Sequence, residues 1–283
     1  MSRAYRFMRF PEGKTKAVTF SYDDGYTDDL KIARILYRYG MKGTFNLNSA
    51  YIGTVNKMTK EEIEEHLLTK GHEVAIHGEY HHAPGRMSQV AGINEFLNCR
   101  LSLERTFGRI IRGCAYPDSG IVILENGIKK EDIKSYMRAI GIDYARTLGG
   151  DNDAFLLPED YLEWMPTAHQ VNPKIFDYID KFNGINVLEG RYSNRSPRLF
   201  YVWGHAYELK DNWALLEKIS EKLSGKEDVW YATNIEIYDY VMAYRALVFS
   251  ADEKTVYNPT LKAIWFEVGE KLYTVKSGET LKL

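Results

Sequence analysis

The sequence has few cysteines, no long apolar run and almost no net charge. Its two cysteines, Cys99 and Cys114, exclude a disulfide framework in a chain of 283 residues, and we expect both to be buried free thiols. No stretch of about 18 apolar residues occurs, so the sequence predicts no membrane span. The net charge of −2, from 37 basic and 39 acidic residues, gives no indication of a nucleic-acid partner.

A signal peptide is also not evident. The N-terminal residues read MSRAYRFMRFPEGK and contain no apolar run long enough for a signal peptide. We therefore expect a cytoplasmic protein. With 45% hydrophobic and 27% charged residues, the composition is that of an ordinary globular protein. The length allows one α/β domain of barrel size or two smaller domains.

Short apolar runs alternate with segments of helical periodicity along most of the chain. The apolar runs predict strands at 16–22, 43–47, 73–77, 110–116, 142–147, 199–203 and 229–232. Capping boxes, Thr59 with Glu62 and Thr233 with Glu236, predict the starts of two of the helices between them. The alternation predicts a parallel sheet with helices outside, and about seven such units favour a closed barrel over an open sheet.

The pattern changes near residue 247. Residues 263–268 and 271–275 are short alternating runs joined by Gly269 and Glu270, which predicts a β-hairpin with a tight turn. The sequence therefore predicts a barrel from residue 1 to 246 and a C-terminal β extension from 247 to 283, packed on the barrel.

Side chains with acid–base and metal-binding chemistry follow three of the predicted strands. Asp23 and Asp24 end the first, His77 and His81 follow the third, and His205 ends the strand at 199–203. In α/β barrels, the active site lies at this end of the strands. Each signal by itself is weak, since Asp-Asp-Gly is also typical of a turn before a helix, and histidines are more often structural or solvated.

Taken together, these residues predict a catalytic metal site. Asp24, His77 and His81 form a three-ligand set that leaves positions for water and substrate. The set suits Zn best among the divalent metals considered, although Co, Ni, Fe and Mn are compatible with it. Asp23 beside the set would take a proton from the attacking water, and His205 would protonate a leaving amine.

The same residues resemble the polysaccharide deacetylase family, whose members carry a NodB-homology domain and form carbohydrate esterase family 4. The segment Thr19–Gly25 is similar to the family's first motif, and Gly71–His81 is similar to the second. Cys114–Pro117 and Arg198–His205 resemble the third and fifth motifs. The resemblance spans roughly residues 15–245, and its motifs occur in the family's order.

This resemblance implies a fold and an activity. The fold is a distorted (β/α)7 TIM-like barrel. The activity is that of a hydrolase acting on non-peptide carbon–nitrogen bonds, here a metal-dependent deacetylase that removes an N- or O-acetyl group from a sugar or oligosaccharide. The resemblance makes Asp23 the base and His205 the acid, and it makes Asp24, His77 and His81 the metal ligands.

The third motif departs from the family pattern. The family has an arginine shortly before the proline, whereas Ala115 precedes Tyr116 and Pro117 here. Arg146, near the end of the strand at 142–147, could supply the guanidinium instead and hold Asp23 ionised. A surface salt bridge is the alternative interpretation of Arg146.

Further site residues are less specific. A backbone N–H near Pro117 is expected to stabilise the oxyanion. Asp118 either meets a cationic substrate or is a turn residue. Glu208 and Asp211 either orient His205 or are solvated loop acids. The predicted substrate-binding residues are Tyr116, Pro117, Asp118, Trp164 and Trp203.

Two other functions stay open at this stage. The altered third motif is compatible with a metal-dependent amidohydrolase acting on a small non-sugar amide. A catalytically inactive barrel that binds a glycan is the third hypothesis. The expected partner is an acetylated carbohydrate or a small amide, without nucleic acid or membrane, and the oligomeric state is open.

Overall fold

The molecule is organised around a parallel sheet with β2 (Lys16–Asp23) at its centre. The computed structural model describes residues 5–190 and 195–283. One edge of β2 pairs with β8 (Arg198–Gly204), and the other pairs first with β9 (Val229–Tyr231) and then with β3 (Thr44–Leu47). The outer parallel strands are β4 (Glu73–Ile76), β5 (Gly113–Ala115) and β6 (Tyr144–Arg146) beyond β3, and β7 (Ala168–His169) beyond β8.

The two outer strands are joined by the segment that leads into β7. Trp164 forms a parallel bridge with Arg146 of β6, and its N–H donates to the carbonyl of Ala145 at 3.0 Å. Further along, the N–H of Thr167 donates to the carbonyl of Tyr201 in β8 at 2.8 Å. The sheet therefore curls round, and the expected distorted (β/α)7 barrel is confirmed.

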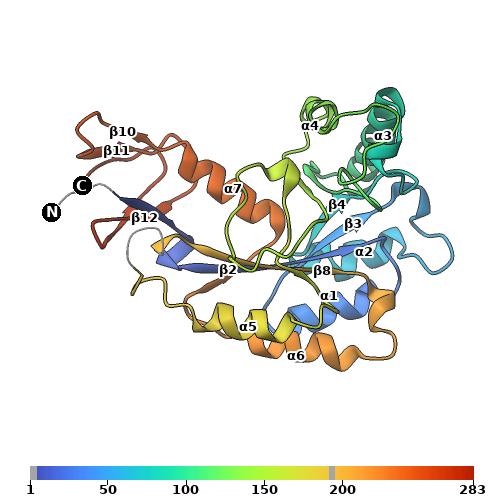
Figure 1. Ribbon diagram of the computed structural model, residues 1–283, viewed down its shortest axis with the longest axis horizontal. Helices are drawn as coiled ribbons and strands as arrows, with labels where there is room; N and C mark the ends of the chain where they lie inside the picture. The colour runs from blue at the N-terminus through green and yellow to red at the C-terminus, as the bar shows by residue number, and fades with distance from the viewer. Residues whose placement is uncertain (1–4, 191–194) are drawn as a thin grey trace.

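Helices cover the outside of this barrel. In Figure 1, α1, α5 and α6 lie along one side of the sheet, and α3 and α4 lie on the other. The capping boxes predicted at Thr59 and Thr233 are both present. Among the described residues, no helix combines the length and apolar character needed to cross a membrane. The outer helices are α1 (Asp29–Arg38), α2 (Lys60–His66), α3 (Gln89–Phe107), α4 (Lys130–Ala139), α5 (Ile175–Gly184) and α6 (Trp213–Leu223).

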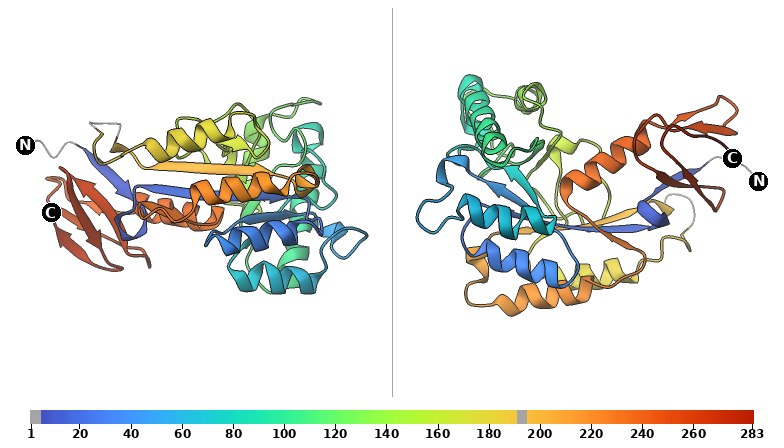
Figure 2. Two further views of the ribbon diagram at one scale, coloured as in Figure 1. Left: turned by 90° about the horizontal axis from the view of Figure 1, so that it is seen from below. Right: turned by 180° about the vertical axis from the view of Figure 1, so that it is seen from behind.

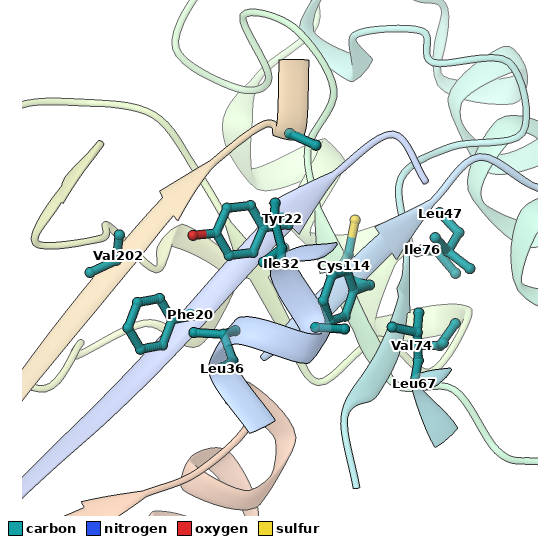
Figure 3. Packing of buried hydrophobic residues seen from close by; sticks show 14 of the residues in the cluster. Phe20, Tyr22, Ile32, Leu36, Leu47, Leu67, Val74, Ile76, Cys114 and Val202 are labelled. Carbon is teal, nitrogen blue, oxygen red and sulfur yellow. The ribbon is translucent and has the colours of Figure 1, made fainter. Parts of the chain in front are cut away.

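Side chains alternate along β2 between the helices and the barrel interior. Phe20 points outward and packs in the core with Ile32 and Leu36 of α1 (Figure 3). Ser21 and Asp23 belong to the opposite face, since both accept hydrogen bonds from a side chain of neighbouring β3. A large apolar core thus lies between the sheet and the helices, whereas the other face of β2 turns Ser21 and Asp23 toward the barrel interior.

The N-terminal end of the barrel is closed by α7 (Asn234–Arg245). Asn234 is fully buried, and its side chain accepts a hydrogen bond from the Thr19 hydroxyl at 2.8 Å. The next N–H of the helix, from Ile235, donates to the carboxyl of Glu73 in β4 at 2.9 Å. The start of α7 therefore forms a polar floor under the barrel, and the opposite end is left for the active site.

The C-terminal segment forms two small antiparallel sheets at the end of the molecule where the described chain begins (Figures 1 and 2). The predicted hairpin is present as β12 (Ile264–Val268) and β13 (Lys271–Val275). β1 (Arg6–Arg9) joins this hairpin by pairing with β12. The other sheet contains β10 (Val248–Phe249), β11 (Thr255–Tyr257) and β14 (Thr280–Lys282). The predicted domain division at residue 247 stays a prediction.

Candidate active site

A tight turn after β2 separates the two neighbouring carboxylates. Asp23 is the last residue of β2 and is 1% exposed. Asp24 and Gly25 both adopt left-handed backbone conformations, with φ of 78° and 68°. For a residue other than glycine such a conformation costs about 1–3 kcal/mol and is typical of functional sites. A Cβ atom at Gly25 would lie 2.9 Å from a terminal methyl group of Leu47, so a larger residue would have to displace that side chain.

The turn brings Asp24 to the two histidines that follow β4. Oδ1 of Asp24 lies 3.7 Å from Nε2 of His77 and 3.4 Å from Nε2 of His81. The two imidazole rings are nearly perpendicular, with centroids 4.8 Å apart. Left-handed backbone at His81, with φ of 67°, turns its ring back toward the cluster.

These three side chains fit a divalent metal. Ligands that bind zinc at about 2.0–2.2 Å in tetrahedral geometry lie roughly 3.4 Å from one another, close to the two separations found here. The Nδ1 atom of His77 lies 2.8 Å from the carbonyl oxygen of Ala115, so Nδ1 carries the proton and the lone pair of Nε2 faces Asp24. The donor set and its tautomer therefore suit a metal ion.

Asp23 is held by groups that lie on four other strands or directly after them. The side-chain amide of Asn46, in β3, donates to Oδ1 at 2.8 Å, and the guanidinium of Arg146 donates to Oδ2. Nε2 of His77 and Nε2 of His205 lie 3.9 and 3.8 Å from the same Oδ2. Burial raises the pKa of Asp23, but these charges and the Asn46 hydrogen bond outweigh it, so the pKa lies below its ordinary value.

Arg146 contacts Asp23, which the sequence left as one of two interpretations. It is 1% exposed, which is incompatible with the alternative of a surface salt bridge. Its guanidinium carbon lies 4.3 Å from the centre of the Trp203 ring, so the indole packs against the cation while the cation contacts Asp23.

His205 follows β8 and faces Asp23 from the opposite side to His77. Its Nδ1 lies 2.9 Å from Oε1 of Glu208, in the short helix η7 (Ala206–Leu209). Tyr207 stacks on the imidazole with centroids 4.9 Å apart and is 46% exposed. Burial lowers the pKa of His205, but Glu208 and Asp23 outweigh it, so the net pKa lies above its ordinary value.

Comparison with known proteins indicates a related family. The family model described as polysaccharide deacetylase matches residues 10–144. This segment, slightly less than half of the chain, is similar to the polysaccharide deacetylase family. The match confirms the resemblance seen in the motifs of this segment. No curated protein matches the chain in sequence.

Solved deacetylase structures share the fold. A polysaccharide deacetylase from Mycobacterium smegmatis is 16% identical, with a TM-score of 0.57, over 83% of this chain and 93% of that one. The Xyl-CE4 domain of a xylanase from the hindgut metagenome of Trinervitermes trinervoides is 20% identical, with a TM-score of 0.51, over 81% and 92%. The Streptococcus pyogenes deacetylase PplD is 17% identical with a TM-score of 0.41, and the chain spans 55% of its length.

The substrate-binding residues predicted for this deacetylase fold do not all face the opening. Tyr116 is 2% exposed, and its hydroxyl donates to the carbonyl of Leu162. Trp164 is 1% exposed and packs against Tyr201 inside the barrel, with ring centroids 5.2 Å apart. We therefore correct these two assignments, because both side chains pack in the core.

The other predicted substrate-binding residues have different surroundings. Asp118 has a left-handed backbone with φ of 49°, and its carboxylate pairs with Arg86 at 2.8 Å, as expected of a turn residue. The carbonyl of Pro117 accepts a hydrogen bond from Gly120 within the same turn. Trp203 is partly exposed and lies edge-on to His169, with ring centroids 4.5 Å apart. It also lies edge-on to His205, with ring centroids 5.7 Å apart, which places it beside the catalytic histidine candidate.

Two polar residues at this site were not predicted from the sequence. Asn46 is fully buried between Asp23 and Ser21, and the only sequence signal was an amide within an apolar strand. His169 at the end of β7 contacts Glu208, with Nε2 at 3.0 Å from Oε1. Among the described residues, His169, His205 and Glu208 form a second group whose ligand-type atoms lie within 4.8 Å of one another.

Proposed function

We propose that this protein is a metal-dependent deacetylase that hydrolyses an N- or O-acetyl group on a sugar or oligosaccharide. The observation that supports this most directly is the position of Asp23. A single oxygen of its carboxylate lies 3.9 Å from a nitrogen of the candidate metal cluster and 3.8 Å from the ring of His205. Base, metal ligands and acid therefore surround one reacting centre.

In this proposal Asp24, His77 and His81 hold the metal. A divalent ion at this position would lower the pKa of a water molecule and polarise an acyl oxygen. Such an ion could be Zn, Co, Ni, Fe or Mn, since one carboxylate and two imidazoles suit all of them. The buried hydrogen bond from His77 to Ala115 keeps its ring oriented for this role.

Asp23 and His205 then move the two protons of the hydrolysis. Asp23 accepts a proton from water as the water oxygen attacks the acyl carbon. Nε2 of His205 donates a proton to the departing nitrogen or oxygen as its bond to carbon breaks. Acetate and the free amine or alcohol are the products. Arg146 keeps Asp23 ionised before the attack, and the lowered pKa of Asp23 is consistent with that role.

Aromatic rings at the opening support a sugar as the substrate. Tyr207 lies against His205, and Tyr26 lies edge-on to Tyr207 with centroids 5.9 Å apart. Trp203 adds a third, partly exposed ring beside the same histidine. Aromatic side chains of this kind offer apolar faces with a polar edge, which suits the mixed surface of a pyranose.

The proposal is tested by acetate release and metal content together. The purified chain is stripped with a chelator, reloaded with Zn, Co, Ni, Fe or Mn, and assayed on acetylated chitooligosaccharides, acetylated xylan and a panel of small cyclic and linear amides. Asp23→Asn is expected to bind metal normally and to lose turnover by about 10²–10⁴-fold. Asp177→Asn, at an exposed aspartate of α5, is the matched control.

The outcomes separate the three hypotheses. Turnover of acetylated sugars that depends on metal and on Asp23 supports the proposal. Turnover of small amides alone would replace the sugar substrate by a non-sugar amide. Sugar binding without acetate release under every metal would indicate an inactive binding barrel.

A further inference from the structure

The carboxylate of Glu208 lies between two histidines from different parts of the chain. Its Oε1 is 2.9 Å from Nδ1 of His205 and 3.0 Å from Nε2 of His169. Its Oε2 accepts the backbone N–H of His205 at 3.1 Å and the side-chain amide of Gln170 at 2.8 Å. Four N–H groups thus occupy the roughly four acceptor positions of an ionised carboxylate.

The last residue of β7 and the residue after it supply two of these four donors. Gln170 follows His169 directly, is fully buried, and also donates from the same nitrogen to the carbonyl of His205 at 2.8 Å. Gly204 is needed for this contact, because a Cβ atom there would lie 2.5 Å from the Gln170 amide. The end of β7 and the end of β8, which His205 follows, are therefore linked through the carboxylate of Glu208.

This arrangement determines how His205 presents its two nitrogens. With four donors around it, Glu208 has no proton to give, so the hydrogen bond at Nδ1 requires that His205 keep a proton there. Nε2 then faces Oδ2 of Asp23 at 3.8 Å. Burial raises the pKa of the Glu208 carboxyl, but the hydrogen bonds from the surrounding side chains outweigh it and hold the pKa well below its ordinary value.

We propose that His169 is a positioning residue for the leaving-group step: it holds Glu208 in the orientation that keeps a proton on Nδ1 of His205 and directs Nε2 at the departing group. This inference rests on the proposed function for its kinetic consequence. Its structural consequence, the tautomer of His205, does not depend on the substrate.

The kinetic test compares two substitutions of His169 in the metal-loaded full chain. His169→Gln keeps an N–H donor of similar reach, whereas His169→Leu removes the donor at similar volume. His169→Leu is expected to lower kcat for an N-acetylated sugar about tenfold with little change in KM. The same variant should change turnover of 4-nitrophenyl acetate by less than about twofold, because this phenolate leaves without being protonated. His169→Gln should restore most of the N-acetyl activity.

A double-mutant cycle asks whether His169 acts through His205. In a His205→Ala background, His169→Leu is expected to have no further effect on N-acetyl hydrolysis. Equal losses on both substrates, or an undiminished loss in the His205→Ala background, would overturn the proposal. So would loss of a second equivalent of metal in His169→Leu, which would make the His169, His205 and Glu208 group a cation site.

A measurement without turnover keeps the inference separate from the proposed function. With ¹⁵N-labelled histidine, the two-bond ¹H–¹⁵N spectrum should show His205 protonated at Nδ1 in the wild type and in His169→Gln. In His169→Leu this signal should broaden, or the two tautomers should mix. If it is unchanged while the thermal unfolding midpoints agree, His169 does not position His205, whether or not the protein deacetylates sugars.

Discussion

Arg146 at the end of β6 donates a hydrogen bond to Asp23 at the end of β2, across the interior of the barrel. Both residues are about 1% exposed, so the pair is shielded from water. Because Asp23 sits in a buried position, its charge depends on this guanidinium more than a surface carboxylate would.

Replacing Arg146 by methionine should therefore remove most of the activity. Without the cation, the buried Asp23 carboxyl would hold a proton and could not act as base, so we expect kcat to fall by about a hundredfold or more. The activity of Arg146→Lys should lie between that of the wild type and that of Arg146→Met, because an ammonium keeps the charge but not the planar geometry of the guanidinium. Acetate release measures these activities, and Arg138→Met, at an exposed arginine of α4, is the control. Full activity of Arg146→Met would contradict the role assigned to Arg146.

Removing one histidine of the metal cluster should release the metal. His77→Ala is expected to reduce bound metal from about one equivalent per chain to near zero, measured by elemental analysis after dialysis. His82→Ala is a closely matched control, since His82 neighbours His81 but pairs with Glu95 at 3.3 Å. Metal should raise the unfolding temperature of the wild type and of His82→Ala but not of His77→Ala. Equal metal content in both variants would exclude the proposed ligand set.

Glu73 should make the protein less stable as the pH rises toward neutrality. Burial raises the pKa of Glu73 to about 7, from an ordinary value of 4.5. Between these two values the folded state binds a proton that the unfolded state has lost, so the free energy of unfolding falls by up to about 1.4 kcal/mol per pH unit. Glu73→Gln should flatten this dependence, measured by urea unfolding at pH 5, 6, 7 and 8.

The neighbouring His72 provides an internal contrast. Burial lowers the pKa of His72 to about 4, from 6.5, so its contribution to stability is lost as the pH falls through this range. The His72 range overlaps that of Glu73 between pH 4.5 and 6.5, and the two contributions have opposite signs there. His72→Gln should therefore make the free energy of unfolding fall more steeply with rising pH in this range, and it should leave the profile above pH 6.5 unchanged. If Glu73→Gln and His72→Gln changed the slope of the profile in the same direction, the burial of one of these groups would be wrongly described.

The two tryptophans at the barrel should respond differently to truncation. Trp164→Ala is expected to lower the free energy of unfolding by about 3–5 kcal/mol, because it leaves a cavity between aromatic rings. At a temperature where the variant is folded, its KM should match that of the wild type. Trp203→Ala should destabilise less and should reduce turnover, since it removes the ring under Arg146. A raised KM in Trp164→Ala alone would return Trp164 to the substrate site.

Much of the candidate site could be predicted because its residues follow strands. Asp23, His77 and His205 each stand where an apolar run ends, and parallel strands end at the same edge of the barrel. The alternation of apolar runs and helices likewise predicted the barrel. These are local signals, and the family match over residues 10–144 agrees with the resemblance that the motifs in this segment indicated.

The remaining features depend on contacts between distant residues. Asn46 of β3 contacts Asp23 of β2, and His169 and Gln170 contact Glu208, which follows β8; no local sequence pattern marks either set of contacts. The errors at Tyr116 and Trp164 have a related cause. The sequence placed Tyr116 and Trp164 near the site, but only the folded structure shows that both rings are buried in the core.

The pairing of β1 with β12 has a consequence for how the chain is made. Arg9 of β1 contacts Glu267 of β12, 258 positions later in the chain. On the ribosome, β1 therefore emerges long before its partner exists, and at about 5–20 residues per second the interval lasts more than ten seconds. During that time a strand edge containing Phe7 and Met8 is exposed to other nascent chains. We expect the edge of β1 to be the part of the nascent protein that most needs a chaperone.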